Sequence, residues 1–130
     1  MPAVTRRSGA GATATAAAYR SSISESIPSI VGFLVDLLGT KLTANLASVD
    51  VSTVSRWRSG RVTPTDESER RLRGAYQTAR LLLTVESDHT VRAWFIGMNP
   101  QLDDQSPIEL IVEGNTKAVL AAARSFVAFA

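Results

Sequence analysis

Residues 42–64 read LTANLASVDVSTVSRWRSGRVTP, in which apolar residues recur at helical spacing in two short runs. Leu42 and Leu46 lie four residues apart in the first run, and Val54 and Trp57 lie three apart in the second. Residues at these distances are neighbours on one face of a helix. We therefore expect two short helices that pack together through these residues, in a helix-turn-helix arrangement.

Capping residues predict the limits of the second helix. Ser52 belongs to the residue types favoured at a helix N-cap, and Gly60 is the type favoured just beyond a helix C-terminus.

The outer face of this second helix is expected to be polar and basic. Arginine can read O6 and N7 of guanine in the major groove, and short hydroxyl side chains can reach base edges or phosphates. Arginines and a lysine beside the helix would neutralise phosphates. The predicted DNA-binding residues are Lys41, Ser52, Thr53, Ser55, Arg56, Arg58 and Arg61. A solvated basic helix face is the alternative for the same pattern.

Helical punctuation continues on both sides of the motif. An apolar stripe from Ile27 ends at Gly39, Thr40 would cap the next helix, and Asp66 with Glu69 forms a capping box for a long helix.

The C-terminal third continues in the same way. Asp88 would cap one helix, Ser106 with Pro107 and Glu109 another, and Asn115 the last. No segment alternates with a period of two, so we expect an all-α fold.

Three regions are predicted from these patterns. Residues 1–22 are mainly Ala, Thr, Ser, Gly and Arg with little to bury, and are expected to be a disordered tail. Residues 23–86 form the helix-turn-helix domain, and residues 87–130 a small C-terminal helical domain.

Composition excludes several classes of function. The chain of 130 residues has no Cys and a single His, His89, which removes disulfides, thiolate metal sites and most catalytic triads. No apolar run is long enough to span a membrane, and the N-terminus lacks the apolar core of a secretory signal, so a soluble cytoplasmic protein is expected.

Charge is unevenly distributed along the chain. Residues 56–80 carry seven arginines against three carboxylates, whereas residues 86–130 carry three basic residues against six acidic ones. A basic middle suits a polyanion, and an acidic C-terminal third suits a different partner.

Two segments resemble known families. The motif resembles the Xre-type helix-turn-helix of Cro and phage repressors, with matches at Ala47, Val49, Val51, Ser52, Thr53, Val54, Ser55, Trp57, Gly60 and Pro64. It departs at Asp50, where glycine is common in the turn, so the resemblance implies that Asp50 takes a left-handed backbone conformation, which Asp tolerates at modest cost. The C-terminal third resembles the toxin-binding domain of Xre/MbcA/ParS antitoxins, with matches at Trp94, Phe95, Asn99, Pro100, Leu102, Pro107, Leu110, Ile111, Gly114, Val119 and Leu120. It departs from that pattern at Asp103, where the family often has glycine.

The resemblance, which covers about residues 27 to 130, implies a function. Such antitoxins bind a RES-domain toxin that consumes NAD+, obstruct its NAD site, and typically repress their own operon. It implies a protein that is not an enzyme and needs no cofactor or metal. The partners would be the toxin from an adjacent gene, operator DNA and a second copy of the chain, within a larger toxin–antitoxin assembly.

The toxin-binding residues would be Trp94, Asn99, Pro100, Pro107, Arg124, Ser125, Phe126, Val127, Phe129 and Ala130. Apolar anchors among them fit the uncharged centre of a protein interface. The alternative is a plain dimeric helix-turn-helix regulator whose C-terminal helices serve dimerisation or ligand sensing.

Overall fold

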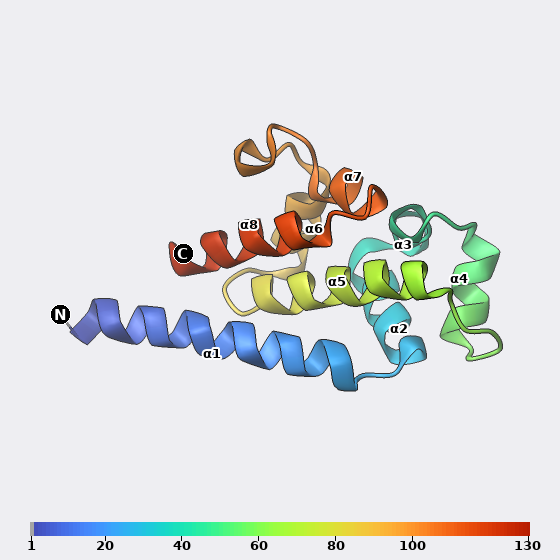
Figure 1. The fold of residues 1–130 in the computed structure, drawn as a ribbon, viewed down its shortest axis with the longest axis horizontal. Helices are drawn as coiled ribbons and strands as arrows, with labels where there is room; N and C mark the ends of the chain where they lie inside the picture. The colour runs from blue at the N-terminus through green and yellow to red at the C-terminus, as the bar shows by residue number, and fades with distance from the viewer. Residues whose placement is uncertain (1) are drawn as a thin grey trace.

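The computed structural model describes the backbone of residues 2–130 and the side chains of residues 11–130. This part of the chain is all-α, as predicted, with no strand in it (Figure 1). The elements are α1 Pro2–Ser24, α2 Ile27–Leu38, α3 Thr40–Ala47, α4 Val51–Arg58, α5 Asp66–Leu82, α6 Asp88–Ile96, the 3-10 helix η1 Pro100–Leu102, α7 Pro107–Val112 and α8 Thr116–Ala128. None of these helices is both long enough and apolar enough to cross a membrane.

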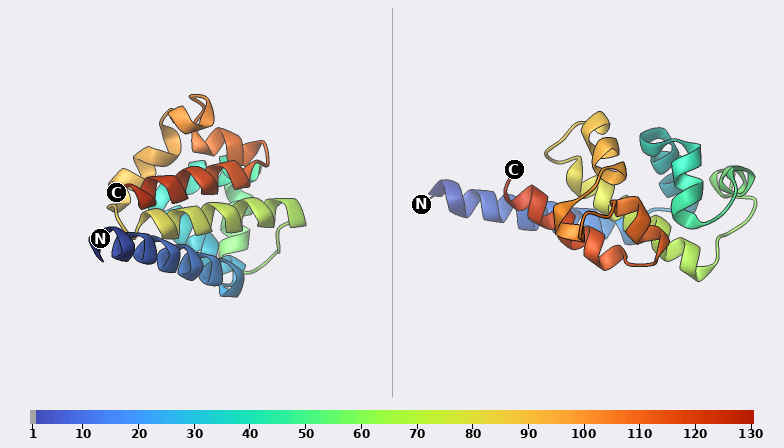
Figure 2. Two further views of the ribbon diagram at one scale, coloured as in Figure 1. Left: turned by 60° about the vertical axis from the view of Figure 1, so that its left-hand side comes forward. Right: turned by 90° about the horizontal axis from the view of Figure 1, so that it is seen from above.

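Helix α5 is the central element of the arrangement. It runs between α1 and α8 and packs against both, α2 and α3 also contact it, and α4 lies near its N-terminal end (Figures 1 and 2). Helix α7 joins the C-terminal region to α3, and α6 contacts α2. The helix-turn-helix is thus fixed to the rest of the molecule on several sides.

One apolar core includes residues from both predicted domains. Its largest fully buried side chains are Phe95, Ile30, Leu34, Leu38, Leu46, Leu72, Leu81, Leu82 and Ile111. The same cluster extends from Ala18 in α1 to Val127 in α8. The domain boundary near residue 86 stays a prediction, and the two parts share this core.

The N-terminal region differs from the expected disordered tail. Residues 2–22 belong to helix α1, and only Met1 lies outside the described residues. Ala18 and Ser22 are buried, because small side chains allow α1 to approach α5 closely. Arg73 of α5 donates hydrogen bonds to the carbonyl oxygens of Ser22, at 2.6 Å, and Glu25, at 2.9 Å. These bonds satisfy carbonyl groups that the end of a helix leaves free.

Four predicted N-caps are wrong by one or two positions. The cap of α4 is Asp50 and not Ser52, and α3 follows Gly39, so Thr40 is its first residue. Thr65 caps α5 and Ser87 caps α6, in place of Asp66 and Asp88. In each case of side-chain capping, a residue one or two positions before the predicted one has the extended backbone that lets its oxygen reach the third N–H of the helix.

Three other predicted helix ends are confirmed. Ser106 accepts a hydrogen bond from the Glu109 N–H, and Asn115 accepts one from Ala118. Gly39 ends α2 with φ 90°. The left-handed conformation expected of Asp50 is wrong, because the left-handed residue of the helix-turn-helix bridge is Ser48, with φ 58°, and Asp50 is extended with φ −83°.

Candidate DNA-binding and partner-binding surfaces

The inner face of α4 holds the helix to its scaffold as predicted. Val54 and Trp57 are only 1% and 3% exposed and join the core beside fully buried Leu46. Leu42 is partly buried against the same core.

The outer face of α4 carries the predicted polar side chains. Ser52, Ser55 and Arg56 are exposed, and Thr53 is half-exposed. The flanking residues Lys41 at the start of α3, Arg58 at the end of α4 and Arg61 beyond it are also exposed. All seven predicted DNA-binding side chains therefore reach solvent.

A carboxylate organises the first turn of α4. Oδ1 of Asp50 accepts hydrogen bonds from the Thr53 N–H at 2.8 Å, the Thr53 hydroxyl at 2.7 Å and the Ser52 hydroxyl at 2.9 Å. Arg56 Nη2 in turn donates to the Thr53 hydroxyl oxygen at 3.2 Å. The hydrogen bonds from the Thr53 side chain, the Thr53 backbone and Ser52 lower the pKa of Asp50 to about 2.

A second carboxylate faces the end of the same helix. Arg58 Nη2 lies 3.3 Å from Oδ1 of Asp36 in α2, and both side chains are exposed. Part of the positive charge predicted to meet phosphates therefore already has a partner within the protein. The sequence interpretation missed the roles of Asp36 and Asp50, although an Asp two residues before Ser-Thr is a recognisable capping pattern.

Four of the predicted toxin-binding residues line one cleft. The cleft has a volume of about 370 Å³ and lies between α8 and the segment around η1. Its lining residues are Trp94, Met98, Asn99, Pro100, Gln101, Ala122 and Phe126.

Polar groups fix the wall of the cleft. Asn99 caps η1 by accepting a hydrogen bond from the Gln101 N–H at 2.9 Å. Gln101 Nε2 donates to the hydroxyl of Ser125 in α8 at 3.3 Å, which ties η1 to α8. Asp103 follows η1 with φ 54°, which explains why a glycine suits this position in the related pattern.

The remaining predicted toxin-binding residues divide by exposure. Pro107 and Val127 are buried, so they support the fold and offer little surface to a partner. Arg124, Phe129 and Ala130 are exposed, and Phe129, at 84%, is the most exposed large apolar side chain among residues 11–130. Sequence reasoning missed Met98, which is 81% exposed beside the cleft.

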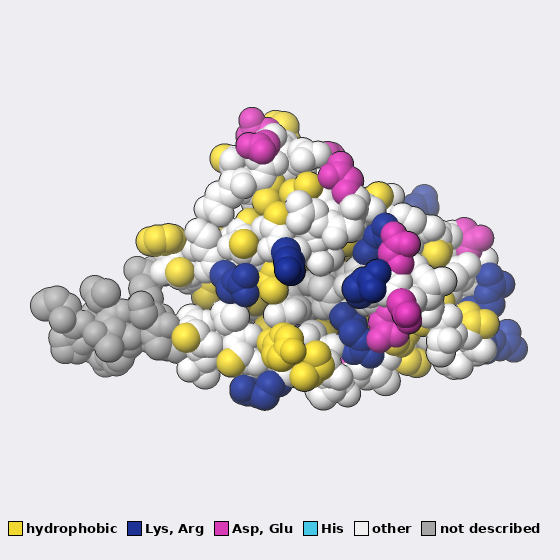
Figure 3. Space-filling view, viewed as in Figure 1, with side chains coloured by type: hydrophobic (Ala, Val, Ile, Leu, Met, Phe, Trp, Pro, Cys, Tyr) yellow, Lys and Arg dark blue, Asp and Glu magenta, His cyan; other side chains and the backbone are white. Residues whose placement is uncertain are grey.

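Acidic and basic side chains are distributed differently on the face shown in Figure 3. Acidic side chains lie at the top, over the loop that follows η1, and others lie on the right among the basic side chains, towards α4 and the start of α5. Asp103 and Asp104 in that loop are both exposed. The two candidate surfaces therefore differ in charge.

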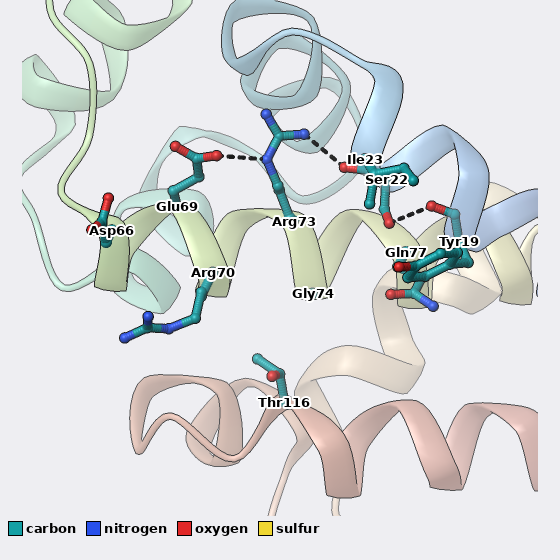
Figure 4. A pocket seen from close by; sticks show the side chains of 10 residues that line it. All are labelled: Tyr19, Ser22, Ile23, Asp66, Glu69, Arg70, Arg73, Gly74, Gln77 and Thr116. Atoms are coloured by element: carbon teal, nitrogen blue, oxygen red, sulfur yellow. Dashed lines mark hydrogen bonds and ion pairs between the residues drawn. The ribbon is translucent and has the colours of Figure 1, made fainter.

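A groove of about 450 Å³ lies where α1, α5 and α8 meet (Figure 4). Its residues are Tyr19, Ser22, Ile23, Asp66, Glu69, Arg70, Arg73, Gly74, Gln77 and Thr116. Tyr19 and Ile23 are exposed beside it. This groove could not be predicted from the sequence, because one of its walls was expected to be disordered.

No protein-family model and no curated protein matches the chain. Among solved structures, the chain is similar to a chain in the crystal structure of the M. tuberculosis MbcT–MbcA toxin–antitoxin complex, with a TM-score of 0.68. The two are 23% identical, and the match covers 79% of this chain and 95% of that chain. At this identity the likeness shows a shared fold, which is all-helical over the described residues. Membership of the Xre/MbcA/ParS family stays a prediction.

Proposed function

We propose that this chain is the antitoxin of a toxin–antitoxin pair. It binds a RES-domain toxin, blocks access to the toxin's NAD+ site, and represses its own operon through α4. The observation that carries the proposal is the fold likeness to a chain of a toxin–antitoxin complex, which extends over almost all of that chain.

The cleft beside η1 supports toxin binding. Trp94 and Phe126 give the cleft an aromatic lining. Met98, four residues after Trp94, and Phe129, three residues after Phe126, expose apolar side chains to solvent. Aromatic residues and Met are enriched at the centres of protein interfaces. The exposed apolar side chains at this end of the molecule therefore fit a protein partner.

Helix α4 supports DNA binding. Its buried face fixes it to the core, while its exposed face carries Arg56 and the hydroxyl side chains. A recognition helix needs this division, because its position in the major groove depends on a rigid scaffold behind it.

Co-expression tests the toxin part of the proposal. The full chain is produced with the product of its adjacent gene, purified by an affinity tag on that product, and the complex and the free partner are assayed for NAD+ consumption. We expect a stable complex in which NAD+ loss is suppressed. A partner that consumes NAD+ at the same rate with and without this chain would contradict the proposal. Sequence-specific DNA binding without any complex would favour the plain regulator.

A further inference from the structure

The first turn of α4 has an unusual hydrogen-bond polarity. An ionised carboxylate only accepts hydrogen bonds, so the hydroxyl hydrogens of Ser52 and Thr53 must both point to Asp50. Neither hydroxyl then has a hydrogen left to donate to DNA. Toward a ligand, the side chains of Asp50, Ser52 and Thr53 therefore offer oxygen lone pairs and no donor.

The opposite polarity begins one turn later. Arg56 carries five N–H donors, and the hydrogen bond from Nη2 to the Thr53 hydroxyl oxygen uses one of them. Its guanidinium can still donate to O6 and N7 of guanine. The outer face of α4 is therefore divided into an accepting end and a donating end.

We propose that Asp50 is a specificity-determining residue of the DNA surface. With Ser52 and Thr53 it forms an accepting end that selects, at the place it faces in the major groove, a base presenting an amino group, cytosine through N4 or adenine through N6, over guanine or thymine. This inference rests on the proposed DNA-binding function.

The accepting end acts by exclusion as well as by attraction. A carboxylate repels phosphates, so it lowers the affinity for DNA in general. A base amino group offsets this repulsion by donating to the free Oδ2 of Asp50 or to a hydroxyl oxygen. Guanine O6 or thymine O4 at the same place would face another acceptor, and that pairing is unfavourable.

Selection from a random duplex pool tests the inference with the full chain. The variants are Asp50→Asn, which can still cap α4 through its carbonyl oxygen but loses the charge and gains N–H donors, and Asp50→Ser, which also caps. We expect the wild type to select cytosine or adenine at one position. In both variants, the selectivity for these bases over guanine and thymine at that position should fall about tenfold. The guanine position assigned to Arg56 should persist in both.

Asp36→Asn is the matched control, since it removes another exposed carboxylate near the same helix. It should raise affinity for all sequences and leave the selected motif unchanged. A wild type and Asp50 variants that select the same motif would overturn this inference alone. A wild type that selects no sequence would overturn the DNA-binding part of the proposed function, and this inference with it.

Discussion

Gly74 of α5 lies so close to Thr116 of α8 that a Cβ atom at position 74 would meet Cγ2 of Thr116 at 2.8 Å and its Cβ at 2.9 Å. The contact joins the helix that follows the helix-turn-helix to the last helix of the chain. Because Thr116 is a short, branched side chain in the first turn of α8, it cannot swing away as the end of a long side chain would.

Gly74→Ala should therefore destabilise the fold. Alanine is favoured over glycine inside a helix by about 1 kcal/mol, but overpacking at a tight contact costs about 1–3 kcal/mol. We expect a net loss, measured as a lower urea midpoint with an unchanged m-value.

Gly32 provides the matched control. It lies inside α2, and a Cβ there would meet only Arg58 Nε at an ordinary 3.7 Å. Gly32→Ala should raise the midpoint, and adding Thr116→Gly to Gly74→Ala should restore most of the loss. Equal gains from both alanine variants would contradict the close approach.

Arg73 should hold the C-terminal end of α1 in place. It donates to two carbonyl oxygens there and to Glu69 at 2.8 Å, and hydrogen bonds to charged groups contribute about 1.5–3 kcal/mol each. Arg73→Met should let this end open locally, so trypsin should cleave faster after exposed Arg20. Arg70→Met, one turn earlier on α5 and in the same groove, serves as control. Cleavage at the same rate in both variants would show that α1 is held by other contacts.

Asp50 should make the stability of the fold depend on pH below about pH 4. Its pKa is lowered from 3.8 to about 2 by the Thr53 and Ser52 hydrogen bonds. A carboxyl whose pKa is lower in the folded state stabilises the fold above the unfolded pKa, and that contribution disappears as the pH falls through the folded pKa. The melting temperature of the wild type should therefore exceed that of Asp50→Ala at pH 5, and the difference should shrink between pH 4 and pH 2. A constant difference over this range would mean that the carboxylate charge does not contribute.

The sequence predicts the buried faces better than the helix starts. Spacing alone identifies Val54 and Trp57, because burial on one side of a helix imposes a period of 3.6 residues. The N-cap of α4 was misplaced because Asp50 and Ser52 are both good caps, and only the backbone path from left-handed Ser48 decides between them.

The sequence pattern does not predict helix α1, for another physical reason. Small residues give no apolar stripe, and the contacts that stabilise the helix come from α5, far away in the sequence. The cleft beside η1 was partly predictable, since Trp94, Asn99 and Pro100 lie close together in the chain. Phe126 joins them only through the packing of α8 against η1.

The two arginines on either side of the α4 C-terminus should affect DNA binding differently. Arg56 lies on the exposed face of α4, so Arg56→Ala should weaken operator binding by about 1–3 kcal/mol and relax the base preference. Arg61 lies beyond the helix, so Arg61→Ala should mainly reduce the salt dependence of binding. Fluorescence anisotropy with operator and shuffled duplexes at several salt concentrations separates these effects. Two variants that bind both duplexes like the wild type would show that α4 does not contact DNA.

Phe129 should contribute to toxin binding more than to folding. Removal of residues 125–130 would also remove buried Val127, so a deletion would test the core and the surface together. Phe129→Ser changes a side chain that is 84% exposed, and surface substitutions usually alter the free energy of unfolding by less than about 0.5 kcal/mol. We expect an unchanged melting temperature, with affinity for the toxin reduced about tenfold or more, as for an aromatic interface anchor.

Ala121→Ser, at another exposed position of α8, is the control for Phe129→Ser. It introduces the same hydroxyl group but removes no apolar anchor, so toxin affinity should stay at the wild-type value when measured by calorimetry. If Phe129→Ser kept full affinity while Phe126→Ala lost it, the contact would lie within the cleft beside η1, because Phe126 lines that cleft and Phe129 does not. Full affinity in both aromatic variants would place the toxin contact elsewhere and contradict the assignment of the C-terminal anchors.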